Sequence, residues 1–331
     1  MATKARALAR ELKIKTTPDR RLSGTGRITI RGMHTMSWQE MGFATGKVSL
    51  RQLLEGGKKA NIDIYDDPMD LEFIIEKIII GGLAEHLGSG LHQAIEVNQA
   101  YVKEFIEGNM NLVSSVKHDP VKVRSLLKAI ARNTATIVDI SALKRDILLR
   151  DNIQISRPTI YDYLDTLNRL MIVEDQPAWN THIRSSASLR KSPKRHFTDV
   201  CLAVAVLGLD KESLFSDLKI TGFLFESLVT HELRVYGQVN DAKVYHYRDS
   251  SGLEVDSIVQ KYNGDWCAFE IKLGTGEIEK AAVSLLKFAS NLDLSKARPP
   301  KSLNIITGTG ISYTRQDGIN VISLASWVHD F

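Results

Sequence analysis

Two acidic residues and a lysine interrupt a stretch of the sequence that otherwise has the pattern of a buried hairpin, EVDSIVQKYNGDWCAFEIK (Glu254–Lys272). The Asn263-Gly264 pair separates its two apolar runs, and Asn-Gly is a strong short-range signal for a hairpin turn. Such a turn folds Asp256 back toward Glu270. Charges are costly to bury unless they are paired or bind a metal, so this pattern needs a chemical explanation.

The second strand of this hairpin places Glu270 and Lys272 on one face, because residues two apart on a strand point the same way. Ile271 then points into the opposite core. Together with Asp256, the hairpin offers two carboxylates and an ammonium. Carboxylate oxygens are ligands that Mg²⁺ prefers, and a lysine near the metal can orient water and offset charge that develops on a phosphate. The set predicts phosphodiester hydrolysis.

A third acid precedes the hairpin in the helical pattern GFLFESLVTHEL. Glu226 falls within a largely apolar stripe, at helical spacing from Phe223 and Leu233. An acid in such a stripe needs a partner, and the metal site of the hairpin could supply one. Glu232 and Glu254 are alternatives, although their expected positions are more exposed.

The elements that must position these residues follow one another as helix, three strands, helix, strand and helix, beginning near Thr198. Apolar periodicity predicts the helices, and alternating or continuous apolar runs between turn residues predict the strands. The expected segments are the helices Ile220 to Tyr236 and Glu277 to Ala289, and the strands Val244 to Arg248, the two arms of the hairpin, Ser302 to Thr307 and VISL.

A compact pattern of three helices and a short extended segment lies between Asp119 and Trp179. The first helix opens at Asp119-Pro120, an N-cap followed by proline at the first helical position. The second runs from about Asp139 to Leu149, the third opens at Ser156, and MIVEDQPAW is extended. This order predicts a winged helix, whose third helix commonly enters a DNA groove. A protein-contact module is an equally good interpretation.

Basic residues on and after the third helix are candidates for phosphate contacts. The exposed face of that helix is mixed in charge, while the following run HIRSSASLRKSPKR is strongly basic; a solvated loop is the alternative for such a run. The candidate nucleic-acid-binding residues are Arg157, Arg169, Arg184, Arg190, Lys191, Lys194 and Arg195.

The whole chain has 331 residues, 43% of them hydrophobic, which is enough for two or three cores. The net charge of +4 permits contact with nucleic acid without requiring it. Cys201 and Cys267 show neither zinc-ligand spacing nor a disulfide framework. FIIEKIII, the richest apolar run, is too short to span a bilayer. We therefore expect a cytoplasmic protein without a membrane segment.

Several segments together give the chain a family resemblance. FE in a helix, then EVD, then EIK, in the order helix, three strands, helix, strand, resembles the PD-(D/E)XK nuclease superfamily. From about residue 20 onward the chain resembles the C-terminal part of predicted prokaryotic AAA-type ATPases, in which a P-loop domain precedes a winged helix and a nuclease-like domain of uncertain function. The supporting segments are LSGTGRI, MSWQEMG, Gly81-Gly82, KSPKRHFTDVCLA, HYRDSSGLEVD and FEIK.

The resemblance implies that Glu226, Asp256, Glu270 and Lys272 are the catalytic residues and that the three acids bind Mg²⁺. It also implies a missing part, because the nearest approach to a P-loop is GFATGKVS, Gly42 to Ser49. That loop has three residues between its glycines instead of four, and Val48 stands where a hydroxyl is needed. We therefore expect a truncated member without ATPase activity of its own, with a partner protein as a possible source of the missing half.

The predicted architecture is a multidomain α/β and α+β protein. Its expected parts are an ATPase-domain remnant (1–67), which includes a strand candidate over Arg27–Ser37, a helical segment (68–115), a winged helix (116–180) and a PD-(D/E)XK restriction-endonuclease-like α/β domain (181–331). The predicted function is Mg²⁺-dependent processing of DNA. One alternative is a non-catalytic DNA-binding or regulatory module with an inherited acid cluster, and another is an ion-pair network without chemistry.

Overall fold

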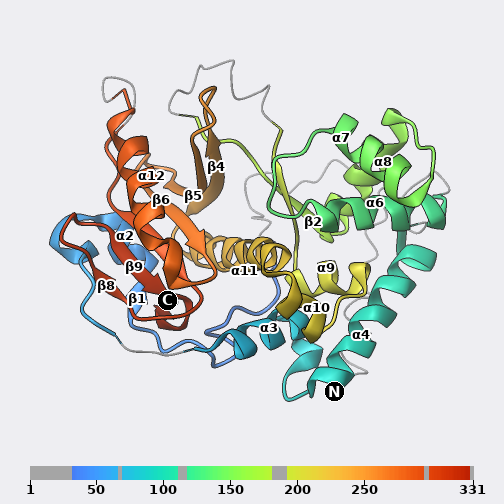
Figure 1. The fold of residues 1–331 in the computed structure, drawn as a ribbon, viewed down its shortest axis with the longest axis horizontal. Coiled ribbons are helices and arrows are strands. Elements are labelled where there is room, and N and C mark those ends of the chain that lie inside the picture. Colours follow the sequence, from blue (N-terminus) through green and yellow to red (C-terminus); the bar gives the residue numbers. More distant parts are fainter. Residues whose placement is uncertain (1–31, 66–68, 111–117, 181–191, 294–297, 329–331) are drawn as a thin grey trace, which may run out of the picture. The chain divides into compact units, whose positions relative to one another are not determined.

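The computed structural model describes residues 32–65, 69–110, 118–180, 192–293 and 298–328. The chain divides into two compact units, Met1–Met33 and His34–Phe331. Nearly all of the described residues belong to the second unit, which combines a helical region with a mixed sheet (Figure 1).

A six-stranded mixed sheet forms the C-terminal part of this unit, in the order β4-β5-β6-β7-β9-β8. The first three strands form an antiparallel meander, β7 and β9 continue it in parallel, and β8 closes the edge antiparallel to β9. The strands are β4 (Ala242–Arg248), β5 (Glu254–Lys261), β6 (Trp266–Lys272), β7 (Leu303–Thr307), β8 (Tyr313–Thr314) and β9 (Asn320–Ser323).

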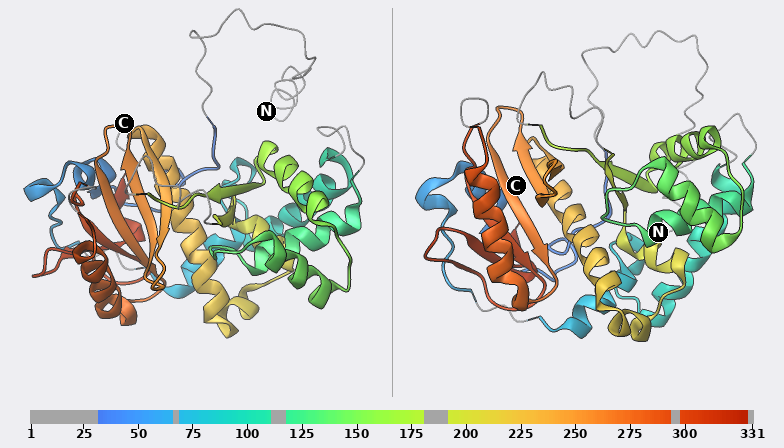
Figure 2. Two further views of the ribbon diagram at one scale, coloured as in Figure 1. Left: turned by 90° about the horizontal axis from the view of Figure 1, so that it is seen from above. Right: turned by 45° about the horizontal axis from the view of Figure 1, so that its top comes forward.

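Two helices cover opposite faces of this sheet. α11 (Leu218–Val239) packs on β4, β5 and β6 within a core that includes Phe269 and Ile271, and α12 (Ile278–Ser290) packs on β5, β6 and β7 in a second core. Apolar residues three and four apart along α12 form the stripe that faces the sheet. Figures 1 and 2 show α11 lying between the sheet and the helical region.

The helical region is built around α9 (Val200–Leu207), which is apolar on almost every side and buried. α9 contacts α11 as well as α3 (Leu71–Ile80), α4 (Leu91–Glu104) and α6 (Pro120–Arg132). α4 continues into a π-helical turn, Phe105–Asn109. α10 (Lys211–Ser216) leads into α11 and packs on α3. The core of this region is therefore continuous with the core between α11 and the sheet.

The segment from α6 onward has the local signals that the sequence predicts. Asp119 caps α6 with Pro120 in its first turn, and capping side chains also begin α7 (Ile140–Asp151) and α8 (Arg157–Arg169). β2 (Val173–Gln176) follows and pairs antiparallel with β3 (Lys194–Phe197). Ile137, between α6 and α7, forms an isolated bridge to Lys194. β2 precedes residue 180 and β3 follows it, so this strand pair spans the domain boundary that the sequence predicts at residue 180.

The segment that follows His34 packs on the sheet and α11. Trp38 is buried, and β1 (Val48–Ser49) pairs in parallel with β10 (Trp327–Val328). α2 (Leu50–Glu55) and a 3₁₀ turn, Gly57–Ala60, come next. Of the strand predicted over Arg27–Ser37, residues 32–37 form neither helix nor strand, and 27–31 lie outside the described residues. The remaining 3₁₀ turns are Ala84–His86, Thr275–Glu277 and Leu324–Ser326.

Three backbone amides of GFATGKVS, the nearest approach to a P-loop, form hydrogen bonds within the protein. The N–H groups of Thr45, Gly46 and Lys47 donate to the carbonyls of Ala325, Trp327 and Ser326, respectively. These contacts bring β1 alongside β10 and direct the amides toward protein carbonyls. Elsewhere, none of the described helices is long and apolar enough to cross a membrane.

Candidate functional site

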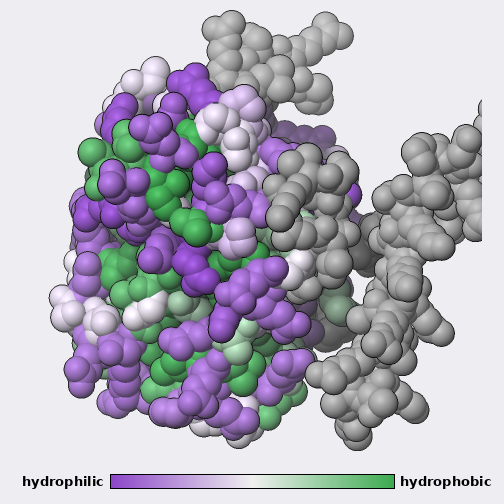
Figure 3. Space-filling model, turned by 90° about the vertical axis from the view of Figure 1, so that its right-hand side faces the viewer, coloured by the Kyte–Doolittle hydropathy of each residue, from purple (hydrophilic) through white to green (hydrophobic). Residues whose placement is uncertain are grey.

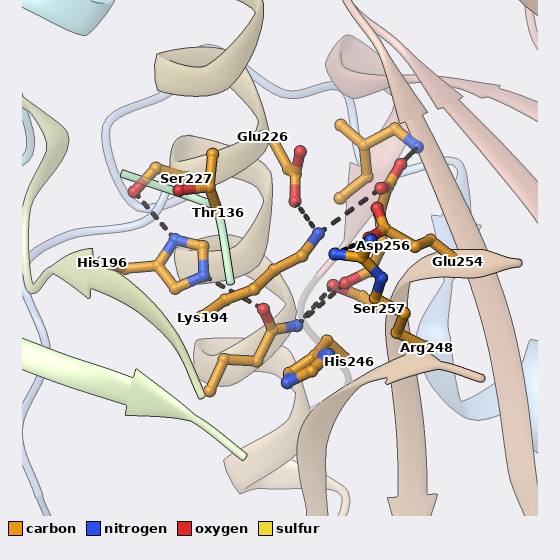
Figure 4. Close-up of polar contacts among 12 residues, drawn as sticks. Thr136, Lys194, His196, Glu226, Ser227, His246, Arg248, Glu254, Asp256 and Ser257 are labelled. Carbon is orange, nitrogen blue, oxygen red and sulfur yellow. Dashed lines mark hydrogen bonds and ion pairs between the residues drawn. The ribbon is translucent and has the colours of Figure 1, made fainter. Parts of the chain in front are cut away.

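Five charged side chains form a chain of alternating sign at the point where β3, α11, β5 and β6 approach one another. Figure 4 labels three of them, Lys194, Glu226 and Asp256. The ammonium of Lys194 lies 2.6 Å from Glu226 Oε1 and 3.5 Å from Asp256 Oδ1. The ammonium of Lys272 lies 3.1 Å from Asp256 Oδ2 and 2.8 Å from Glu270 Oε2. We call these residues the charged chain. Its two lysines each bridge two acids, and Asp256 at its centre contacts both lysines.

The end of the β5–β6 pairing places Asp256 at the centre of the charged chain. The two strands pair from Ser257–Gln260 to Trp266–Phe269 and exchange no pair beyond that point. Asp256 Oδ2 fills the gap by accepting a hydrogen bond of 2.9 Å from the backbone N–H of Ile271. Ile271 packs in the core on the α11 side, as the strand alternation predicts. The turn before β6 has Gly264 at a φ of 89°, a conformation that favours glycine.

The three acids and the lysine that the sequence singles out are therefore brought together. Glu226 reaches the charged chain from the buried side of α11, and Glu270 and Lys272 reach it from the end of β6. The alternatives to Glu226 lie elsewhere. Glu232 accepts hydrogen bonds from Trp38 N–H and the Tyr236 hydroxyl, and Glu254 pairs with Arg248 at 3.0 Å.

Burial and neighbouring charges give the three acids different pKa values. Burial raises the pKa of Glu226 to about 7 and that of Glu270 to about 8, and the repulsion of Asp256 adds to both shifts. Burial also acts to raise the pKa of Asp256, but Lys272, Lys194 and the Ile271 amide outweigh it and lower that pKa below its ordinary value. Asp256 is thus ionised near neutral pH, and protons bind at Glu226 and Glu270, the two ends of the charged chain.

The same balance keeps both lysines charged. Burial acts to lower the pKa of each ammonium, but Glu226 and Asp256 outweigh it at Lys194, and Asp256 and Glu270 outweigh it at Lys272. Both pKa values therefore lie above the ordinary lysine value. Three carboxylates and two ammonium groups leave one excess negative charge when every group is ionised, and one bound proton cancels it.

The fit of the site to a metal ion can be judged from its carboxylates. Within the described residues, no group of three or more His, Cys, Asp or Glu side chains is arranged to hold a metal ion. Glu226 and Asp256 instead share one cation, the Lys194 ammonium. Carboxylate oxygens are ligands that suit Mg²⁺ in chemistry, but the acids of the charged chain are arranged around two lysines and not around a metal position.

A cleft of about 780 Å³ opens beside one side of the charged chain. Glu226 and Lys272 line it, together with two exposed lysines, Lys219 and Lys280, and the backbone around Gly274. Two members of the charged chain are thereby accessible to a ligand in the cleft. Lys194 is not among the lining residues.

A second row of buried, hydrogen-bonded polar groups lies beside the charged chain. His196 Nδ1 is 3.1 Å from Ser227 Oγ, and His196 Nε2 is 3.0 Å from Gln176 Oε1. The Gln176 amide in turn donates to Ser257 Oγ and to the Asp256 carbonyl. These bonds join β2, β3, α11 and β5 immediately beside Lys194 and Asp256 (Figure 4). Sequence reasoning missed this row; alternation along KRHF, which places His196 on the face of Lys194, is the signal that could have found it.

The candidate nucleic-acid-binding residues are placed very differently from one another. Arg157 and Arg169 are exposed on α8, where Arg157 donates to Ser141 Oγ and Arg169 lies 4.0 Å from Asp165. Arg184, Arg190 and Lys191 lie outside the described residues. Lys194 and Arg195 are buried, with only 3% and 6% of their surface exposed.

The prediction of a solvent-facing position therefore does not hold for Lys194 and Arg195. Lys194 enters the charged chain, and Arg195 donates to the Val138 carbonyl and lies 3.3 Å from Asp175. Both residues belong to β3, whose four residues are all buried because the strand is covered on both faces. The basic composition of the surrounding run predicts a hydrated segment, and pairing with β2 overrides it.

Three other segments quoted for the family resemblance meet on the far side of α11. Gly82 N–H donates to Asp199, whose carboxylate also accepts from Cys201 N–H at the start of α9. The carbonyl of Gly82 accepts from Met36 N–H. MSWQEMG, the glycine pair and the FTDV part of KSPKRHFTDVCLA thus pack together, while Lys194 at the start of that last segment belongs to the charged chain.

Comparison with known proteins yields two family models, both described as domains of unknown function. DUF8612 matches residues 71–213 and DUF4143 matches residues 221–327. DUF4143 is found in AAA-ATPase-associated proteins, so the second match associates the chain with that group of proteins. Glu226, Asp256, Glu270 and Lys272 lie in the DUF4143 match, and Lys194 lies in the DUF8612 match. The charged chain therefore joins the two matched regions.

No curated protein matches the chain. One solved structure that does is a half-complex from a tetradecameric assembly of Thermococcus gammatolerans McrB AAA+ hexamers with bound McrC. The similarity is 11% in identity, with a TM-score of 0.23, and it covers 61% of this chain and 70% of that chain. A TM-score of this size does not establish a common fold.

Proposed function

We propose that the charged chain is a phosphodiester-hydrolysing site of the PD-(D/E)XK type that acts on DNA. The observation that carries this proposal is the meeting of Asp256, Glu270 and Lys272 on adjacent strands, with Glu226 beside them, at the wall of a cleft. The element order α11, β4, β5, β6, α12, β7 adds support, because it is the order of that nuclease superfamily.

The residues of this chain would divide the work of hydrolysis as follows. Glu226 and Asp256, with Glu270 as a third donor, would hold Mg²⁺, which as a Lewis acid polarises a phosphoryl oxygen and lowers the pKa of bound water. Lys272 faces the cleft and keeps its charge, so it is placed to stabilise negative charge on a phosphate there. Lys219 and Lys280 would hold the neighbouring phosphates of the strand.

The helical region would supply additional contacts to DNA. The order α6, bridge at Ile137, α7, α8, β2, β3 is that of a winged helix, and this supports the interpretation of α8 as the helix that approaches DNA. Exposed basic residues extend from α7 to α8. They are Lys144, Arg145, Arg150, Arg157 and Arg169. On the face shown in Figure 3, hydrophilic and hydrophobic residues are intermixed. The exposed hydrophobic residues of α7 and α8 include Leu149 and Tyr161.

The first prediction is that purified protein cleaves DNA with Mg²⁺ or Mn²⁺ and not with EDTA. Asp256→Asn and Lys272→Met should each lower the rate by about 10²-fold or more, because each removes a charge that acts on the reacting phosphate. Supercoiled, linear and branched DNA are incubated with each protein and resolved on gels. Asp265→Asn is the matched control, since Asp265 lies at the turn end of the same hairpin and pairs with Arg298 and Lys301.

A second candidate function, a DNA-binding or regulatory module without chemistry, is favoured by one observation. Lys194 and Lys272 already provide a cationic partner for each of the three acids, without a metal. In this case DNA remains intact under all conditions, and a mobility shift at low salt persists in Asp256→Asn and Lys272→Met. The absence of both cleavage and binding would contradict both candidates.

A partner protein that carries an ATPase domain is a further part of the proposal. It rests on the resemblance and on the association of DUF4143 with AAA-ATPase-associated proteins. Gly274 and Gly276 line the cleft, but their run GTGE lacks the Gly-Lys-Ser/Thr ending of a phosphate loop. Any ATP-driven step would then come from the partner.

A further inference from the structure

We propose that the outer face of α7 and the pocket beside it form a docking surface for an acidic, amphipathic segment of a partner protein. This face carries the exposed side chains of Lys144, Arg145, Leu148 and Leu149, which we call the α7 surface. Neither the surface nor its pocket shares a residue with the cleft beside the charged chain. The proposal goes beyond the hydrolysis of DNA: it assigns the cations of α7 to a protein and leaves α8 as the helix that would approach DNA.

α7 exposes two adjacent leucines on the side that its pattern leaves to solvent. The helix buries Ile140, Leu143 and Ile147 toward the core, whereas Leu148 is 43% exposed and Leu149 is 74% exposed. Lys144 and Arg145 precede the two leucines by one helical turn, so the four side chains share one face. Single exposed leucines are ordinary, but an apolar patch rimmed by polar residues is typical of an interaction site.

A pocket of about 550 Å³ adjoins the α7 surface at the turn between α7 and α8. Asn152 ends α7 in the left-handed conformation, at a φ of 54°, and the chain then turns toward α8. The residues that line the pocket are Lys144, Leu148, Ile153, Gln154, Ile155 and Ser156. Ile155 belongs to the core. An apolar side chain of a ligand can therefore enter between Leu148 and the edge of the core, close to the ammonium of Lys144.

The two cations of the α7 surface remain available to a ligand. Within the part of the chain that the structure describes, neither Lys144 nor Arg145 forms a salt bridge. The acids of α7 itself, Asp146 and Asp151, both pair with Arg132 of α6. The surface is therefore positive, and a ligand with carboxylates complements it.

Charge and apolar exposure together select a protein other than this chain as the occupant. The chain's own stretches 1–31, 111–117 and 181–191 contain more basic than acidic residues, and a second copy brings the same net charge of +4. DNA phosphates would pair with the cations but would offer the leucines no apolar surface. An amphipathic acidic helix supplies both contacts, because its apolar face can fill the pocket while its carboxylates approach the cations.

The experiment titrates the full chain into fluorescein-labelled probes and follows their anisotropy. The first probe is a peptide designed as a helix of roughly 18 residues, about five turns, with leucines on one face and glutamates elsewhere. The second probe is the same peptide with serine in place of leucine, and the third is a short DNA duplex. The leucine peptide should bind at least about tenfold more tightly than the serine peptide, and added salt should weaken its binding.

Two double variants test the two kinds of contact separately. Leu148→Ser/Leu149→Ser removes the apolar contact, and Lys144→Glu/Arg145→Glu reverses the charge. Each should weaken binding of the leucine peptide at least about tenfold. All four side chains are exposed, so the fold should be retained, which circular dichroism checks. Because the variants are independent, one that fails to fold leaves the other as the test.

Val283→Ser/Leu286→Ser is the matched control, since it removes two exposed apolar side chains from α12, and it should bind the leucine peptide like the unmodified protein. No binding of this peptide, or equal binding by all folded variants, overturns the proposal. Equal affinity for the two peptides, with DNA binding lost on charge reversal, assigns the surface to nucleic acid instead. A dimer that requires the leucines, without peptide binding, assigns it to a second copy. DNA cleavage is measured separately, because these variants leave the charged chain intact.

Discussion

Asp256 depends on its neighbours for its charge more than any other residue of the site. It is buried, yet it contacts two ammonium groups and accepts a backbone N–H, and these contacts together outweigh the cost of desolvation. Glu226 and Glu270 each contact a single lysine, and burial dominates their pKa values. The number of cationic partners of each acid therefore decides which one stays ionised.

The raised pKa of Glu270 makes folding stability depend on pH. The folded protein keeps a proton on Glu270 up to about pH 8, while the unfolded chain releases it near 4.5, so stability falls as pH rises between these values. Glu270→Gln cannot ionise, so its stability relative to the unmodified protein should rise by up to about 1.4 kcal/mol per pH unit from pH 5 to 8. Urea unfolding at pH 5, 6.5 and 8 measures the difference.

Asp265→Asn provides the contrast for this measurement. The pKa of Asp265 is lowered and the residue lies away from the charged chain, so it is ionised in both states throughout pH 5 to 8, and the difference between this variant and the unmodified protein should stay constant. Parallel curves for Glu270→Gln over the same range would show that Glu270 does not hold a proton in the folded protein.

α11 makes contacts on two of its sides. One side carries Glu226 into the charged chain, and the other carries His231 and Glu232 to the segment that begins at His34. The turn at Gly82, which follows α3, packs beside this second side and bonds to Met36 and Asp199. The position of α11, and hence of Glu226, depends on this packing.

Gly82→Ala tests that dependence, because a Cβ at this position would overlap the carbonyl oxygen of Met36. We expect a loss of about 1–3 kcal/mol in the free energy of unfolding. Gly222→Ala within α11 is the control: a Cβ there meets nothing, and a helix-interior alanine should stabilise by about 0.5–1 kcal/mol. Urea unfolding measures both variants. An unchanged free energy of unfolding in Gly82→Ala would mean that the segment at Met36 moves aside without destabilising the protein.

At the scale of the whole molecule, the helical region and the sheet share one core through α11. The sequence divides residues 68–331 into three parts, whereas the compact unit that begins at His34 includes all of them. A shared buried helix ties the stability of one part to that of the other, so we expect a single cooperative unfolding transition.

The two cysteines report on this cooperativity without any substitution. Cys201 is buried in the helical core, and Cys267 is buried in the sheet. In increasing urea, both thiols should become reactive at the same midpoint, measured by pulsed alkylation and mass spectrometry of the two peptides. Far-UV circular dichroism gives the reference midpoint. Distinct midpoints for the two thiols would instead support separately folding domains.

The parts of the fold that follow from local signals could be predicted, and those that require distant pairing could not. Asp119, Asp139 and Ser156 mark the beginnings of their helices through capping, and Asn263-Gly264 sets the hairpin. Because the hairpin is local, Asp256 and Glu270 could be placed together from the sequence alone.

Lys194 illustrates the opposite case. Its neighbours in the sequence are basic and polar, which is typical of a hydrated surface. Its position depends on the pairing of β3 with β2 and on the approach of α11 and β5, none of which is encoded in the run itself. The same reason explains why the hydrogen bonds of His196 were missed.

The pairing of β1 with β10 has a consequence for synthesis of the chain. Val48 aligns with Trp327, so almost the whole described chain must emerge from the ribosome before β1 has a partner. At roughly 5–20 residues per second, that delay is on the order of tens of seconds. During this interval the apolar residues of α2 lack the sheet surface that finally covers them, and the nascent protein offers chaperones a segment that the mature protein hides.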